Sequence, residues 1–273
     1  QVICMYLEGV RDGRRLMELV RTITPSKPVV IWKGGLSAPG ARAAASHTAS
    51  LAGQRQVWKA FFKQTGDIPE STIEEMVDVA ILLLQLKPPP RGNRVTVLGG
   101  GGGDTVAAGD TCAEAGLEVP PLSPQTRSAL LEFVYLINQG IGNPLDLPIV
   151  FYDMKIMQRV LRLLAADPAL DAIMIRNGSE VFNMTDRFPS VAQYAECIHE
   201  VAAHEAKGKP ILFVVTDETS VEPAEKHARA LREAGVPAIG SLQRACRALS
   251  RVVAYHRYRA EVTGAIPAEP SAG

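Results

Sequence analysis

The sequence has no excess of charge of either sign and only four cysteines. Its 29 lysines and arginines balance 29 aspartates and glutamates over 273 residues. A chain without net charge lacks the basic surface that attracts nucleic acid or an anionic membrane, so we expect neither partner. The cysteines form no CxxC pair, which argues against a zinc or dithiol centre. We interpret Cys4, Cys112, Cys197 and Cys246 as buried thiols of a cytoplasmic protein.

The sequence also lacks the fingerprints of several other classes of protein. It has no signal peptide and no run of 18 apolar residues, so we expect no membrane anchor. No GxxxxGK[ST] P-loop occurs, and no GxG frame in the glycine run has a third glycine three residues on, because Asp104, Thr105 and Val106 stand there. We therefore expect that the chain neither binds NAD nor hydrolyses ATP unaided, and that it has no metal site.

The sequence does contain a regular alternation of two patterns. Short apolar segments typical of strands alternate with longer segments whose apolar residues recur at helical spacing. In residues 153–167, for example, Asp153 is placed to cap a helix whose Ile156, Val160 and Leu164 share one face. This alternation predicts an α/β protein with parallel sheets.

Three successive prolines in KPPPRGN, residues 87–93, mark the expected domain boundary, because proline continues neither the preceding helix nor the following strand. Residues 91–273 are predicted to form a complete doubly wound, flavodoxin-like domain. Its five expected strands are residues 94–98, 117–122, 171–175, 211–215 and 236–240. Residues 1–90 are predicted to form a second flavodoxin-like domain, incomplete at its N-terminus. Its expected strands are residues 2–6, 28–32 and, from a weaker pattern, 66–70.

The segment RAAASHTASLAG, residues 42–53, holds His47, which is the only histidine in the first 198 residues. It follows the predicted strand 28–32 and a glycine-bearing connection, at the end of the sheet where open α/β proteins bind ligands. A neutral imidazole serves as base, ligand or nucleophile near pH 7. A hydrogen-bonded structural histidine is the alternative. The other four histidines lie in charged helical segments, where we expect solvated side chains.

Five glycines, Gly99 to Gly103, run from a predicted strand into a predicted helix. Backbone N–H groups in such a loop approach a phosphate closely, and the helix N-terminus favours its negative charge. The alternative is that the glycines serve a tight turn and close packing of strand and helix. Spacing alone does not decide between these two interpretations.

Several segments together resemble the central domains of the NDP-forming acyl-CoA synthetases, the superfamily that includes succinyl-CoA synthetase. They are YLEGVRDG, KPVVIWKGG, ARAAASHTASLAG, RGNRVTVLGGGGGD and GNPLDL. The resemblance implies flavodoxin-like domains and an acid–thiol ligase that interconverts acyl-CoA, ADP and phosphate with a carboxylic acid, CoA and ATP. It also implies that His47 carries the phosphoryl group between two sites. An imidazole nucleophile suits this role, since it divides one difficult transfer into two easier ones.

The same resemblance assigns roles to other residues. Glu8 matches the glutamate that orients the histidine ring, although a strand-end carboxylate also suits a helix cap. Gly100, Gly101, Gly102 and Gly103 match the loop that holds the phosphate. Ser46 and Thr48 flank the histidine as possible support. Asn143 and Asp146 of GNPLDL match a segment on the same face of the second domain, and the alternative is a turn with an aspartate cap.

The chain departs from the family pattern in places. Asp104 stands where relatives commonly have proline, and Ala49 and Ser50 replace glycine and alanine after the histidine. The added Cβ of Ala49 restricts a swinging loop. No SxSG-type turn precedes the first strand, and the family's CoA-binding and ATP-grasp domains have no counterpart in this sequence.

These departures define what the chain would need in order to act. The resemblance implies CoA, ATP or ADP, phosphate and a small acyl substrate, with Mg at a nucleotide site outside this chain and no tightly bound cofactor. We expect CoA-binding and ATP-grasp domains or subunits as partners, and an oligomer. The alternative is a non-catalytic domain of the same fold that binds a CoA ester or assembles subunits.

Overall fold

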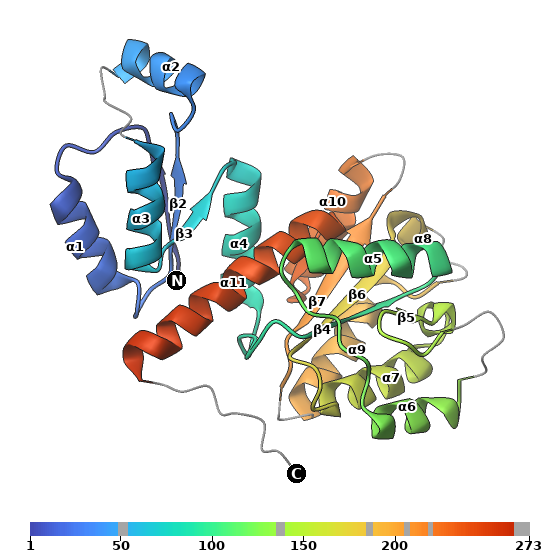
Figure 1. Cartoon of the computed structure of the whole chain (residues 1–273). Coiled ribbons are helices and arrows are strands. Elements are labelled where there is room, and N and C mark those ends of the chain that lie inside the picture. The colour runs from blue at the N-terminus through green and yellow to red at the C-terminus, as the bar shows by residue number, and fades with distance from the viewer. Residues whose placement is uncertain (49–53, 135–139, 184–187, 205–207, 218–220, 265–273) are drawn as a thin grey trace. The chain divides into compact units, whose positions relative to one another are not determined.

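The structure, a computed structural model, describes residues 1–48, 54–134, 140–183, 188–204, 208–217 and 221–264. Within these residues it contains two parallel β-sheets, one of three strands and one of five (Figure 1). The described residues form two compact units, one comprising residues 1–84 and 254–264, the other lying within residues 85–253. The predicted α/β class is therefore confirmed.

Unit 1 is built on the three-stranded sheet, with strand order β1-β2-β3. The strands are β1 (Ile3–Leu7), β2 (Val29–Lys33) and β3 (Ile68–Glu70), and the helices are α1 (Gly13–Ile23), α2 (Ala38–Thr48), α3 (Arg55–Thr65) and α4 (Ile73–Gln85). The weak strand pattern at residues 66–70 is therefore confirmed as β3. Val29 and Ile31 of β2 pack with Val20 of α1 and with Trp58 and Phe61 of α3. This apolar cluster fixes α1 and α3 against one face of the sheet.

Local signals explain where these helices begin and end. Asp12 accepts a hydrogen bond from the backbone N–H of Arg15 at 2.9 Å and so caps α1. Helix α3 ends at Gly66, whose φ of 67° is readily adopted only by glycine. Two residues, Gly66 and Asp67, therefore separate α3 from β3, and Glu70 lies at the carboxyl end of the strand.

Unit 2 is built on the five-stranded sheet, with strand order β5-β4-β6-β7-β8. The strands are β4 (Val95–Gly99), β5 (Leu145–Asp146), β6 (Ala172–Gly178), β7 (Ile211–Thr216) and β8 (Ala238–Ile239). The helices are α5 (Gly102–Glu114), α6 (Pro124–Leu131), the short 3-10 helix η1 (Pro148–Phe151), α7 (Met154–Ala166), α8 (Ser179–Asn183), α9 (Val191–His204), α10 (Val221–Glu233) and α11 (Leu242–Thr263). Strand β6 and strand β7 are nearly all buried, as expected for parallel strands covered on both faces.

One predicted strand is wrong. Residues 117–122 form no strand, and only a single bridge joins Arg94 to Glu118. Pro120 and Pro121 lack the N–H groups that a ladder requires. The fifth strand is instead β5, which pairs with Leu98 and Gly99 at the end of β4. The apolar pattern of residues 117–122 reflects the burial of Leu117 and Leu122 in the core and not membership of the sheet.

The C-terminal helix α11 begins in unit 2, and its residues from Ala254 belong to unit 1. Tyr255 donates a hydrogen bond from its hydroxyl to the carbonyl of Thr24 at 3.0 Å. The ring of Tyr258 occupies the space where a Cβ on Gly66 would lie. The division into domains of residues 1–90 and 91–273 stays a prediction, and the compact units add the end of α11 to the first part.

Two expectations about single residue types are wrong in part. Cys4 is exposed, since it lies on the outward side of the edge strand β1, whereas Cys112, Cys197 and Cys246 are buried as expected. Two histidines are also less solvated than expected. His227 stacks on Phe182 with ring centroids 5.0 Å apart, and burial lowers the pKa of His256 to about 4.

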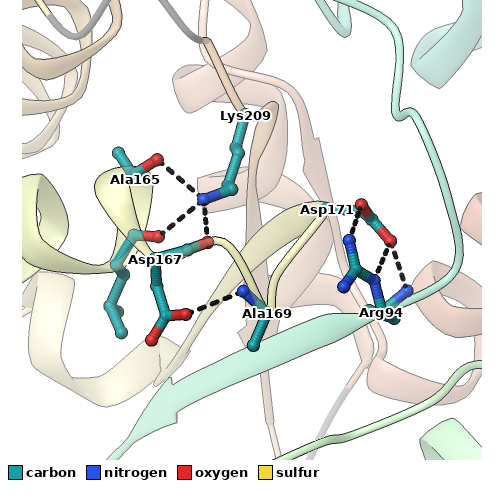
Figure 2. Close-up of polar contacts among 7 residues, drawn as sticks. Arg94, Ala165, Asp167, Ala169, Asp171 and Lys209 are labelled. Atoms are coloured by element: carbon teal, nitrogen blue, oxygen red, sulfur yellow. Dashed lines mark hydrogen bonds and ion pairs between the residues drawn. The ribbon is translucent and has the colours of Figure 1, made fainter. Parts of the chain in front are cut away.

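A polar network joins the amino ends of the strands in unit 2 (Figure 2). Arg94, which precedes β4, pairs through two nitrogens with the carboxylate of Asp171, which precedes β6, at 2.8 and 2.9 Å. Lys209 precedes β7 and donates to the carbonyls of Ala165, at 2.8 Å, and Asp167, at the end of α7. A cation at a helix C-terminus is favourable, so we interpret this network as structural. It occupies the end of the sheet opposite the glycine run.

Candidate functional site

The carboxyl ends of the three strands in unit 1 border a cavity of about 810 Å³. Glu8 follows β1, Lys33 ends β2 and Glu70 ends β3, and all three side chains line it. The opposite wall comes from α2, through Ala43, Ala44 and Ser46. Parallel strands bring their carboxyl ends to one edge, which is where open α/β sheets bind ligands. The cavity is therefore the candidate site of unit 1.

Glu8 has one carboxylate oxygen engaged and one without a hydrogen-bond partner. The hydroxyl of Tyr6 donates to Oε1 at 3.1 Å. Oε2 is buried and accepts no hydrogen bond from any residue that the structure describes. A buried carboxylate oxygen without a donor is costly, so a hydrogen-bond donor is expected at this point when the site is complete.

Lys33 is a buried cation beside Glu8 and is 4% exposed. Its Nζ donates to the backbone carbonyl of Glu8 at 2.8 Å and also to the carbonyl of Gly34. The same nitrogen lies 5.2 Å from the ring centre of Trp58. Burial lowers the pKa of Lys33, and the negative charge of Glu8 opposes that shift. Lys33 thus ties together the ends of β1 and β2. The signal in the sequence is a lysine that ends an otherwise apolar strand pattern, and Lys33 was not predicted as a site residue.

His47 lies in the last turn of α2, one turn after Ala43 and Ala44, which line the cavity. The structure describes its backbone but not the placement of its side chain, and the same holds for Thr48. Ser46 lines the cavity and donates from its hydroxyl to the carbonyl of Ala43 at 2.8 Å. The departures at Ala49 and Ser50 lie outside the described residues. Glu8, Ser46 and the helix that carries position 47 are therefore brought together.

In unit 2 the glycine run forms the turn between β4 and α5. Gly101 has a φ of 107°, which favours glycine, and a Cβ on Gly100 would lie 3.2 Å from Pro148. These two glycines therefore fit the tight-turn interpretation. Gly102 and Gly103 have ordinary φ values. A Cβ added to Gly102 would lie 3.7 Å from Oδ2 of Asp146, and one added to Gly103 would meet nothing within 4 Å. The fold itself does not explain this second pair.

The N-terminus of α5 is surrounded by charged side chains. The backbone N–H of Gly101 donates to Oδ1 of Asp146 at 2.6 Å. Asp104, in the first turn of α5, pairs through Oδ2 with Nη1 of Arg176 from β6 at 2.6 Å. Asp146 is thus placed at the glycine loop, as the sequence segment GNPLDL implies. Arg176 was missed because a charged residue near the end of a strand gives no pattern of its own.

Asn143 is engaged elsewhere. Its Nδ2 donates to the carbonyls of Val95 and Pro120, at 2.9 and 2.8 Å. Val95 begins β4, whereas the glycine loop follows the end of that strand. The structure therefore brings Asp146 to the loop and ties Asn143 to the fold. The role of Asn143 in binding stays a prediction.

The described residues hold neither a metal-binding cluster nor a membrane-spanning helix. No group of three or more histidine, cysteine, aspartate or glutamate side chains is arranged to hold a metal ion. No helix in this part of the chain is both long enough and apolar enough to cross a membrane. The cavity of unit 1 and the glycine loop of unit 2 are the sites to which the sequence motifs point.

Comparison with known proteins shows which proteins this chain resembles. Residues 1–83 match the family described as succinyl-CoA ligase like flavodoxin domain. The alpha subunit of ADP-forming acetate–CoA ligase II from Pyrococcus furiosus is 34% identical over 238 residues, which are 87% of this chain and 50% of that subunit. ADP-forming acetate–CoA ligase I from Archaeoglobus fulgidus is 32% identical over 260 residues, covering 95% of this chain and 35% of the relative.

A solved structure agrees with the sequence relatives. The dinucleotide-forming acetyl-coenzyme A synthetase 1 of Ca. Korarchaeum cryptofilum, in its apo form, superimposes with a TM-score of 0.78 and 26% identity, covering 97% of this chain and 55% of that one. The same protein has been solved with phosphate and ADP. This chain spans about half the length of the first relatives or less. In sequence and fold it belongs with the NDP-forming acyl-CoA synthetases that have flavodoxin-like domains.

Proposed function

We propose that the chain is a component of an NDP-forming acyl-CoA synthetase and that His47 is its phosphoryl carrier. The observation that supports this proposal best is the buried Oε2 of Glu8, which has no hydrogen-bond donor among the described residues. It lines the same cavity as the helix that bears position 47. A protonated ring nitrogen of His47 is the donor that this oxygen requires.

Phosphate first attacks the thioester carbonyl of the acyl-CoA, the carbon–sulfur bond breaks, and the CoA thiolate leaves, which gives an acyl phosphate. The phosphoryl group then moves in two transfers. One imidazole nitrogen attacks the phosphorus of an acyl phosphate, the bond from phosphorus to the acyl oxygen breaks, and the carboxylic acid leaves as its anion. A terminal oxygen of ADP next attacks the phosphohistidine, the phosphorus–nitrogen bond breaks, and ATP forms. Glu8 accepts the hydrogen bond from the other ring nitrogen throughout. It keeps the attacking nitrogen unprotonated and aimed at phosphorus.

The remaining components belong to this proposal as well. The glycine loop of unit 2, with open N–H groups at Gly102 and Gly103, holds the phosphoryl group at one of its two sites. CoA, and the nucleotide with its Mg, bind to CoA-binding and ATP-grasp domains or subunits. The reaction takes place in the cytoplasm, in an oligomer. The relatives from Pyrococcus furiosus and Archaeoglobus fulgidus are ligases of acetate, and we propose a small carboxylic acid as the substrate of this chain.

Phosphorylation in the presence of the partner domains tests the proposal. The chain is mixed with CoA-binding and ATP-grasp domains and radiolabelled ATP. We expect a label that survives base and is lost in acid. Phosphohistidine behaves in this way, whereas a phosphate ester of serine does not. His47→Asn is expected to abolish it, while His199→Asn, an exposed histidine on α9, keeps it. Normal turnover of His47→Asn without a base-stable label would rule out the carrier role.

A second variant tests the role of Glu8. Glu8→Gln removes the charge that fixes the ring, so we expect labelling to slow by about tenfold while the label still falls on His47. Glu18→Gln, at an exposed glutamate of α1, is the control and is expected to label at the normal rate. Equal rates for the two variants would show that Glu8 does not act on the ring.

A further inference from the structure

The ion pair between Asp104 and Arg176 lies at the entrance to the glycine loop. Asp104 stands in the first turn of α5, directly after Gly102 and Gly103. The first N–H groups of a helix have no partner within the helix, so those of Gly102 and Gly103 are available to an anion. A carboxylate in the same turn competes for these groups and repels a phosphate dianion. The direction in which the Asp104 carboxylate points therefore decides whether the loop accepts phosphate.

Arg176 is positioned by the sheet. Strand β6 pairs with β4 in parallel register, with Ile175 opposite Leu98. The next residue, Arg176, therefore lies beside Gly99, where the loop begins, and its carbonyl oxygen is 3.6 Å from the place of a Cβ on Gly99. Because the register fixes the backbone, the arginine side chain reaches the loop from a rigid strand.

The pair is close, and the arginine is mostly shielded from water while the aspartate is partly exposed. Nη1 of Arg176 lies 2.6 Å from Oδ2 of Asp104, and the side chains are 14% and 41% exposed. Nε of Arg176 is buried and has no hydrogen-bond partner among the described residues. The guanidinium thus binds the carboxylate through one nitrogen and still has an unused donor. The second carboxylate at the loop, that of Asp146, accepts the backbone N–H of Gly101.

We propose that Arg176 is a positioning residue for phosphoryl binding at the glycine loop. By pairing with Asp104 it holds that carboxylate away from the N–H groups of Gly102 and Gly103. Its positive charge offsets the charge that the phosphoryl group brings to a loop already flanked by two aspartates. The inference rests on the proposed function, which places the phosphoryl group at this loop.

Binding of inorganic phosphate to the full chain tests the inference directly. The amide signals of Gly102 and Gly103 are followed by NMR as phosphate is added. We expect both to shift, and Arg176→Met to weaken the binding by about tenfold, because it leaves Asp104 uncompensated. Asp104→Asn in the same chain removes the repulsion, so the double variant is expected to regain most of the affinity.

A matched ion pair in unit 2 provides the control. Arg232 and Glu225 also meet at 2.6 Å, with side chains 15% and 43% exposed. Arg232→Met therefore removes a pair of the same length and exposure, and we expect it to leave the phosphate shifts unchanged. Three results would overturn the inference: no shift in the unsubstituted chain, no loss in Arg176→Met, or no recovery in the double variant.

The rate of His47 labelling in the complete enzyme separates this inference from the proposed function. Arg176→Met is expected to slow labelling about tenfold, and the double variant to restore it. If His47 is never labelled but phosphate binding still depends on Arg176, the carrier role fails while the positioning role stands. If labelling occurs at the same rate in Arg176→Met and phosphate binding is unchanged, the positioning role fails alone.

Discussion

A buried lysine is the residue on which the geometry of the first site depends. Lys33 donates to the carbonyl oxygens of Glu8 and Gly34, which end two neighbouring strands. Carbonyl oxygens at strand ends have no ladder partner beyond the sheet, so a buried cation satisfies them and fixes where Glu8 begins. These contacts offset part of the cost of removing the ammonium group from water, and burial still lowers the pKa of Lys33.

Replacing this lysine is expected to loosen the site. Lys33→Met keeps the apolar stem but leaves both carbonyl oxygens without their donor, so we expect a loss of about 2 kcal/mol in the free energy of unfolding. Urea denaturation measures it. Lys59→Met, at an exposed lysine of α3, is the control and is expected to change stability by less than about 0.5 kcal/mol. A loss no larger than that of the control would show that water replaces the lysine.

The positions of candidate site residues were predictable where a motif carried them, whereas their roles stay predictions. Glu8 and Asp146 were predicted from quoted segments, and both lie at the carboxyl edge of a sheet. Lys33 and Arg176 were missed. Arg176 meets Asp104 across 72 positions of sequence, and such a contact depends on the pairing of β4 with β6, which a hydrophobic pattern does not specify.

At the scale of elements, hydrophobic pattern predicted the long strands well and the short ones poorly. Strand β5 has only two residues, so it offers no alternation to detect. Residues 117–122 are apolar enough to read as a strand, but two prolines prevent pairing. Asn143 links residues 117–122 to strand β4, since its side-chain amide donates to the carbonyls of Val95 and Pro120. The amide thus holds the connection 117–122 beside β4.

Removing this amide is expected to cost stability without affecting phosphate. Asn143→Ala breaks two partly buried hydrogen bonds and leaves two carbonyls unpaired, so we expect unfolding to become easier by about 2 kcal/mol. Asn93→Ala, which loses two exposed hydrogen bonds to Gly116 and Glu118, is expected to lose less than half of that. Denaturation measures stability, and the amide shifts of Gly102 measure phosphate binding. Weakened phosphate binding in a stable Asn143→Ala variant would favour a binding role for this residue instead.

At the scale of the whole molecule, the chain consists of two parallel-sheet units, each with its candidate site at the carboxyl edge of its own sheet. The order of helices and strands was sufficient to predict this architecture. Composition did not reveal the ionisable groups that burial perturbs. In unit 1, burial raises the pKa of Asp67 to about 7 and lowers that of His256 to about 4. These two shifts have opposite effects on stability as pH changes.

The sign of each effect follows from proton binding. Asp67 is 5% exposed, and its folded pKa lies above the ordinary value of 3.8, so the folded chain binds more protons between pH 4 and 7 and loses stability as pH rises. His256 has a folded pKa below the ordinary 6.5, so the unfolded chain binds more protons between pH 4 and 6.5. Its contribution therefore increases as pH rises. The two groups largely cancel in this window.

Substitution of either group is expected to expose the pH dependence that the other contributes to the free energy of unfolding. Asp67→Asn leaves the histidine unopposed, so the free energy of unfolding should increase between pH 4.5 and 6.5, by up to about 1.4 kcal/mol per pH unit. His256→Gln leaves the aspartate, so the free energy of unfolding should decrease over the same range. Urea denaturation at three pH values measures both slopes. The two groups have opposite effects on the slope, so equal slopes in the two variants would show that folding shifts the pKa of neither group.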